Sequence, residues 1–206
     1  MANKMESWLR ATPSSGSGNG TVQVSAMENT GRNVRTSFIS FSVENNSVSP
    51  VTRTVNQKGK PEFVTVDEES HVPKEGKTIT IKGQSNSQAL TFSQGGGVAV
   101  DLILDLPDTY RVNGMDVENG EAIPGDPGAT ASYEFQISFT IPKNETVENR
   151  TAVLVVEDYN GNEDSCIITL NAGDAYITIS SGDIELNYLG DPVTVQVQSN
   201  VNWVVS

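Results

Sequence analysis

The sequence contains one cysteine and one histidine in 206 residues, and this scarcity removes most of the common catalytic chemistry. Cys166 has no second cysteine with which to form an intrachain disulfide. His71 cannot by itself supply the clusters that most metal sites use, and most nucleophile–base pairs are excluded for the same reason. We therefore expect a protein that is not an enzyme and that needs no cofactor.

Basic residues are also few. Lysine and arginine number 13 against 26 acidic residues, which gives a net charge of −13. This charge repels phosphate backbones and anionic lipid, so neither nucleic acid nor a membrane surface is expected as a partner.

Long apolar runs are missing as well. The N-terminal residues contain no apolar segment of the length that a secretory signal needs, and no later stretch approaches the length of a membrane span. We expect a protein that is made and used without secretion machinery.

The sequence does contain short runs in which apolar and polar residues alternate. They lie at residues 21–25, 78–82, 133–139 and 192–197. Alternation with period two and many β-branched residues predicts half-buried strands, and no window carries a helical stripe. Short strands separated by glycine-rich turns predict an all-β fold of tandem immunoglobulin-like β-sandwiches.

Two hairpins and one long connection can be placed more closely. Residues 152–156 and 166–170 are predicted to pair across Asn160-Gly161, and residues 37–43 to pair with 51–55. A long loop is predicted at residues 93–130, between these two hairpins in the sequence. Within it, residues 98–106 are predicted as a strand and residues 113–129 as an irregular surface loop.

A repeat of about 114 residues divides the chain. Residues 64–66 and 84–86 return as 177–179 and 198–200, and Val22-Gln23-Val24-Ser25 returns as Phe135-Gln136-Ile137-Ser138. A fixed period of domain size indicates an array of domains. It predicts a partial domain at residues 1–63, a complete domain at 64–175 and the front strands of a further unit at 176–206.

The first unit resembles the BACON domain family. The resemblance is carried by Trp8 with the Ser/Gly-rich turn that follows, by Asn29 and Arg35, and by the terminal run Val55-Asn56-Gln57-Lys58-Gly59. Residues 177–206, with the run Asn200-Val201-Asn202-Trp203 near their end, look like the front of the same family. The resemblance implies an immunoglobulin-like module. Such modules are attached to carbohydrate-active enzymes and proteases of gut bacteria and also occur in phages that infect them, so carbohydrate binding and a spacer role are both implied.

Candidate metal and catalytic groups lie in two acidic stretches. Asp158, Asn160, Asn162 and Asp164 place oxygen atoms at alternate positions, as calcium loops do. The glycine and the twelfth residue do not fit that loop, and a solvated hairpin tip is the other interpretation. A glycosidase would need two carboxyl groups at a defined separation. The carboxylates that could supply them are Asp101, Asp105, Asp108, Asp116, Glu118, Glu121 and Asp126. No activity motif surrounds them.

The aromatic residues divide into two classes. Trp8 and Trp203 lie on alternating strands at the position that the family uses for its core, so we expect them between the sheets, with sugar stacking as the alternative. The candidates for a surface platform that binds a glycan are Tyr110, Tyr133, Tyr159 and Tyr188.

The partial units predict assembly. The last segment contains the front strands that the first unit lacks, and uncovered sheet edges are normally paired by another chain. The residues expected to take part are Ile177, Ile179, Val193, Val195, Val197, Trp203, Trp8, Val22 and Val24. The rival explanation is a longer protein that completes its own third domain beyond Ser206.

The preferred function is therefore a virion structural protein, such as a capsid auxiliary, head-fibre or tail component. It would be assembled in the host cytoplasm, with further copies of itself or other virion proteins as partners and with host-surface or glycan adhesion as an additional role. The alternative is a carbohydrate-binding, adhesive or spacer module at a bacterial cell surface.

Overall fold

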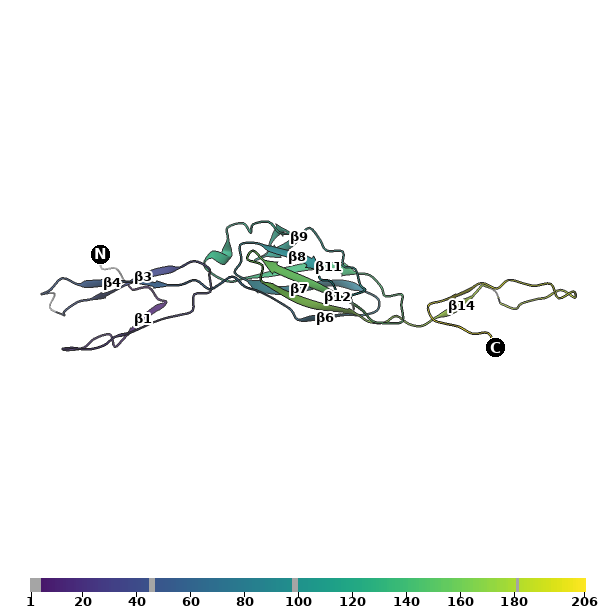
Figure 1. The fold of residues 1–206 in the computed structure, drawn as a ribbon, viewed down its shortest axis with the longest axis horizontal. Coiled ribbons are helices and arrows are strands. Elements are labelled where there is room, and N and C mark those ends of the chain that lie inside the picture. The colour runs from purple at the N-terminus through teal and green to yellow at the C-terminus, as the bar shows by residue number, and fades with distance from the viewer. Residues whose placement is uncertain (1–4, 45–46, 98–99, 181) are drawn as a thin grey trace.

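The computed structural model describes residues 5–44, 47–97, 100–180 and 182–206. Within these ranges all regular elements are β-strands except one short helical turn, η1 (Pro127–Ala129), so the predicted all-β fold is confirmed. Figure 1 shows a middle unit between two thinner arms, one holding the N-terminus and the other the C-terminus. No helix in the described ranges is long and apolar enough to cross a membrane.

The middle unit is a sandwich of two sheets. One sheet has the strand order β10-β9-β11-β7-β5 and the other has the order β6-β13-β12-β8. The strands are β5 (Val64–Val66), β6 (Glu69–Val72), β7 (Lys77–Ser85), β8 (Leu90–Gln94), β9 (Thr109–Val112), β10 (Met115–Glu118), β11 (Tyr133–Ile141), β12 (Arg150–Asp158) and β13 (Glu163–Leu170). Two face-to-face sheets of short, mostly antiparallel strands are typical of an immunoglobulin-like module.

Alternation along the central strands explains the core of the middle unit. In β11 every second residue is buried, and in β12 the buried residues alternate with half-buried ones. The ring of Phe92 packs against Tyr110 and Phe135, with centroid distances of 4.8 and 5.7 Å. Because successive side chains of a strand point to opposite faces, period-two sequences place one apolar face of each sheet between the layers.

The connection between β8 and β11 differs from the prediction. Residues 100–106 form no strand, and Val98 and Ala99 lie outside the described residues. The apolar residues of this segment do belong to the core, since Leu102 and Leu104 are buried. The side chain of Gln94 holds this segment by donating to the carbonyl oxygen of Leu102 and accepting from the amide of Leu104, at 2.8 Å each. The predicted irregular loop at 113–129 is wrong in part, because it contains β10 and η1, and β10 pairs with β9.

The N-terminal arm contains two small sheets. β1 (Leu9–Thr12) pairs with β2 (Gln23–Ala26), and β3 (Arg35–Phe41) pairs with β4 (Val51–Gln57). This confirms the predicted hairpin of 37–43 with 51–55 except at residues 42 and 43, which form no strand. Leu9 and Ile39 are the buried apolar side chains among the described residues of this arm. Two-stranded sheets are marginal on their own. The arm is therefore a half-built sandwich layer with little core.

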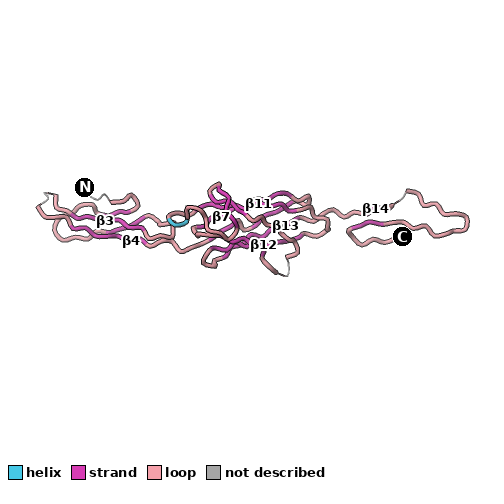
Figure 2. The backbone as a smooth tube through the Cα atoms, turned by 90° about the horizontal axis from the view of Figure 1, so that it is seen from above, coloured by secondary structure: helices cyan, strands magenta, loops and turns pink. Residues whose placement is uncertain are grey.

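The C-terminal arm is a long, narrow hairpin (Figure 2). β14 (Ile177–Ile179) pairs with β15 (Val197–Ser199), with Ile177 opposite Ser199. The predicted strand at 192–197 is wrong for 192–196, which form no strand. The physical reason is that a strand requires a hydrogen-bonded neighbour, and beyond β15 the backbone bond from Ser180 to Gln196, at 3.0 Å, continues the pairing by only one step.

Candidate protein interface

Every strand of the arms has a single neighbour, because the three sheets described there are two-stranded. β2 is bonded only to β1, and β15 is bonded only to β14. We call residues 22–26, which contain β2, the head edge, and residues 193–197, which run into β15, the tail edge. An unpaired strand edge presents free N–H and C=O groups that another strand can bond. Among the free edges of the arms, these two carry valines at alternate positions, 22 and 24 on one and 193, 195 and 197 on the other.

The side chains along both edges are apolar and accessible. Val24 on the head edge is 47% exposed and Val193 on the tail edge is 51% exposed. Val22, Ile177 and Ile179 are exposed as well, while Val195 and Val197 are half-buried. Sequence reasoning expected these residues to take part in assembly. The structure places them in two groups at opposite ends of the molecule (Figure 1).

The two tryptophans differ in burial. Trp8 is half-buried, and the guanidinium carbon of Arg35 lies 4.4 Å from its ring centroid. Trp203 is 49% exposed, so its expected position between two sheets is wrong for this structure. The reason is that the C-terminal arm has only one layer, and no second sheet covers the ring.

A partly buried polar junction joins the N-terminal arm to the middle unit. Arg32 donates to the backbone oxygen of Asn86 at 2.6 Å, lies 3.5 Å from Glu62 and bonds Asp126. The backbone amide of Arg32 also donates to Gly128, at 3.1 Å. Sequence reasoning missed this junction, because it joins residues that lie up to 94 positions apart.

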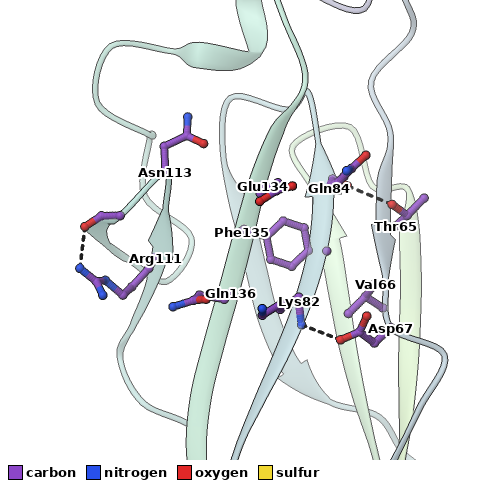
Figure 3. Close-up of a pocket in the computed structure, with 12 residues that line it drawn as sticks. Thr65, Val66, Asp67, Lys82, Gln84, Arg111, Asn113, Glu134, Phe135 and Gln136 are labelled. Carbon is purple, nitrogen blue, oxygen red and sulfur yellow. Dashed lines mark hydrogen bonds between the residues drawn. The ribbon is translucent and has the colours of Figure 1, made fainter.

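An open groove lies on the sheet of the middle unit (Figure 3). Its volume is about 630 Å³. The polar residues that line it are Thr65, Asp67, Lys82, Gln84, Arg111, Asn113, Glu134 and Gln136. Arg111 already donates to the backbone oxygen of Gly114 at 2.7 Å, and the sole aromatic lining is the buried Phe135. The groove therefore offers hydroxyl, amide and charged groups, but no exposed ring for stacking.

The four candidate tyrosines do not form one platform. Tyr110 and Tyr133 are buried in the middle unit, so their expected surface position is wrong. Burial raises the pKa of Tyr110 to about 12, and burial also raises the pKa of Tyr133, whose hydroxyl donates to the backbone oxygen of Ser87 at 2.9 Å. Alternation explains both positions, because each tyrosine occupies an inner-face site of its strand. Tyr159 and Tyr188 are exposed, but they lie on different units.

The candidate calcium loop is organised by its own hydrogen bonds. The Asp158 carboxylate accepts from the backbone amides of Asn160 and Asn162, at 2.9 Å each, and from the side chain of Asn162. Asp164 instead accepts from the amide of Val66 at 2.8 Å. Among the described residues no group of three or more His, Cys, Asp or Glu side chains is placed to hold a metal ion. The geometry is that of a hairpin tip.

Three of the seven candidate catalytic carboxylates are engaged in structural contacts. Asp101 accepts from the amide of Thr151 at 2.7 Å, Asp116 lies 3.1 Å from Arg111, and Asp126 bonds Arg32. The Asp101 contact holds the 100–106 segment to β12, the Asp116 contact joins β10 to β9, and the Asp126 contact belongs to the junction with the N-terminal arm. The four others are Asp105, Asp108, Glu118 and Glu121, and none of them makes a side-chain hydrogen bond or ion pair within the described ranges.

Comparison with known families identifies one part of the chain. Residues 2–58 match the family BACON, described as "Putative binding domain, N-terminal". This match confirms the resemblance for the N-terminal unit, which therefore carries a BACON domain and is a binding module of non-catalytic type. No curated protein matches the chain.

Proposed function

We propose that the chain is a non-enzymatic assembly protein whose arms bind other proteins by strand addition. The observation that carries this proposal is the pair of unpaired edges, the head edge and the tail edge, each lined by valines that are exposed or half-buried. In strand addition the backbone hydrogen bonds supply affinity, and alternate side chains supply specificity. Both requirements are met at the two edges.

The setting that we propose is a virion, with the protein as a capsid auxiliary, head-fibre or tail component. Immunoglobulin-like units in line, without a disulfide framework and with a binding edge at either end, suit a structural protein that joins neighbours. Genes for capsid, portal or terminase proteins beside the coding sequence would support this setting.

The second candidate is a carbohydrate-binding, adhesive or spacer module at a bacterial cell surface. The binding-domain match at residues 2–58 and the exposed rings of Tyr159 and Tyr188 favour it. A glycan array separates the two candidates. Retention on a glycan that is lost in Tyr159→Ala or Tyr188→Ala would support the adhesive module.

Strand addition can be tested in the cells that produce the protein. A photoreactive amino acid placed at Val24 or at Val195 should crosslink to a protein, because both side chains lie on the apolar face of their edge. The controls are Ile103 and Met115, exposed apolar positions of the middle unit that lie on neither edge and should crosslink less. Equal labelling at all four positions, or none at any, would show that the edges do not bind protein.

A further inference from the structure

The partner at these edges can be named from the repeat. We propose that it is a second copy of this chain: the C-terminal arm of one copy adds to the N-terminal arm of the next, and together they form one complete immunoglobulin-like unit. This inference rests on the proposed function and specifies its partner. The middle unit shows how the two halves fit, because it contains both of them in one piece.

The C-terminal arm has the local structure of the front of the middle unit. Val64 lies opposite Ser85 in the pair β5–β7, and Ile177 lies opposite Ser199 in β14–β15. Both segments turn at a glycine of left-handed conformation, Gly76 with φ 72° and Gly190 with φ 73°. The same local turns and register, 113 to 114 residues apart, mean that this arm folds as the front half of a unit.

The polar contacts of the two front halves also match. Asn86 accepts from the amide of Phe63, and Asn200 accepts from the amide of Tyr176, both at 3.0 Å. The hydroxyl of Ser85 donates to the Phe63 oxygen at 2.7 Å, and the hydroxyl of Ser199 donates to the Tyr176 oxygen at 2.8 Å. The two front halves thus share the same polar bonds at the point where each begins.

The N-terminal arm has the local structure of the back of the middle unit. The side chain of Asn29 donates to the backbone oxygens of Asn33 and Lys58, at 2.8 and 3.2 Å. Asn144 makes the equivalent bonds to Glu148 and Asn171, at 2.8 and 2.9 Å. By this correspondence β2, β3 and β4 are the counterparts of β11, β12 and β13. The sequence of the arm contains no counterparts of β5, β6 and β7.

The middle unit shows where those missing strands belong. There β7 lies between β5 and β11, and β11 lies between β7 and β9. Adding the sheet β14-β15 of one copy to the sheet β2-β1 of the next gives the order β14-β15-β2-β1. This reproduces β5-β7-β11-β9 with β1 in the place of β9. It uses the free edge of β2 and the free edge of β15, so neither small sheet has to come apart.

The register follows from the pairs in the middle unit. Ile137 lies opposite Ile81, and both are about 1% exposed. Their counterparts are Val24 and Val195. The same repeat offset of 113 to 114 residues places Val22 opposite Val197 and Ala26 opposite Val193. Valines that are exposed or half-buried in one copy thereby occupy core positions of the shared unit. Each Å² of apolar surface that is buried stabilises the shared unit by about 25 cal/mol.

Charge favours the same pairing. Residues 1–63 carry seven basic and four acidic side chains, whereas residues 176–206 carry three acidic and no basic ones. The two arms together carry no net charge, so the net charge of −13 lies in the middle unit. Opposite charges on the two arms speed the encounter and disfavour the pairing of two C-terminal arms.

Pairing within one copy is prevented by the shape of the molecule, since the middle unit separates the two arms (Figure 1). The contact is therefore head-to-tail, which builds rings or filaments and not closed two-fold dimers. Trp203 stays outside the shared unit, because Trp8 already fills its counterpart position.

The register can be tested by disulfide trapping between full-length chains. Ser25 and Thr194 are the counterparts of Ser138 and Thr80, whose hydroxyl oxygens lie 2.8 Å apart. A chain with Ser25→Cys and a differently tagged chain with Thr194→Cys should form a disulfide under mild oxidation. Cys166 does not interfere, because it is fully buried and burial raises its pKa to about 11.

The matched control pairs Ser25→Cys with Gln198→Cys, four residues away on the same face. Those two positions would lie too far apart for a disulfide. We expect at least about tenfold more linked product for 25 with 194 than for 25 with 198. Equal yields, or no linkage for either pair, would overturn the second-copy joint. Photocrosslinks from Val24 and Val195 to a different protein would still uphold the proposed function.

Discussion

Asn144 is a buried polar residue that joins two segments of the back half of the middle unit. It is 1% exposed, and its amide is the donor to two backbone oxygens. Asn144→Ala leaves those oxygens without that donor, and we expect a loss of about 2–4 kcal/mol in the free energy of unfolding. Urea denaturation measures this loss. Asn202→Ala, at an exposed position, should change little, and an equal effect of the two substitutions would contradict the role of Asn144.

The buried tyrosines predict a loss of stability at high pH. In the unfolded chain both phenols ionise near pH 10, whereas burial raises the pKa of Tyr110 to about 12 and also raises that of Tyr133. Between about pH 10 and 12 the folded state therefore binds more protons than the unfolded state, and its stability falls as pH rises. Urea midpoints at pH 9 and 11 test this expectation. Tyr110→Phe should weaken the dependence, and Tyr188→Phe should leave it unchanged. A midpoint that does not move would contradict it.

At the scale of elements, the junction at Arg32 connects the N-terminal arm to the middle unit. Arg32→Ala removes the donor to Asn86 and leaves the buried Glu62 carboxylate without its cation. We expect a loss of about 1–3 kcal/mol and faster proteolysis between the arm and the middle unit, because a partly buried ion pair loses one partner. Arg53→Ala on the exposed face of β4 is the matched control. Identical cleavage rates in both variants would show that Arg32 does not hold the arm.

Alternation in the sequence predicted the strands that have both a sheet neighbour and a core to cover. It failed where the apolar residues lack a continuous strand neighbour. Alternation located β7, β11 and the hairpin of β12 with β13, because each has a sheet neighbour and a core below it. The same alternation at 192–196 gave no strand, since the pairing with the opposite limb of the hairpin stops at the bond between Ser180 and Gln196. At 100–106 the apolar residues are buried, but the segment forms no strand ladder: the Gln94 side chain bonds Leu102 and Leu104, and the amides of Asp101 and Leu102 share the Thr151 oxygen.

The residues of the candidate interface also divide into those that sequence could identify and those that it could not. The apolar edges were identified from sequence, because repetition showed which strands each arm contains. The Arg32 junction was not, because Glu62 and Asp126 are brought to Arg32 only by folding. Tyr110 and Tyr133 were misplaced because a tyrosine fits an inner face as readily as a surface when its hydroxyl finds a partner or a gap in the core.

At the scale of the whole molecule, the central claim is that the two arms are halves of one unit that different copies complete. Two variants isolate the halves. Val24→Lys blocks the head edge and leaves the tail edge intact, whereas Val195→Lys blocks the tail edge and leaves the head edge intact. The lysine charge would have to be buried in the shared core, which is strongly unfavourable. Circular dichroism checks that the middle unit of each variant stays folded.

The most direct measurement is the mass of these two variants by light scattering, alone and mixed in equal amounts. Head-to-tail completion predicts that the unaltered chain forms larger species and that each variant alone stays monomeric. The mixture should form dimers and nothing larger, since it contains one intact head edge and one intact tail edge. Assembly of either variant alone, or a mixture that remains monomeric where the unaltered chain assembles, would contradict the claim.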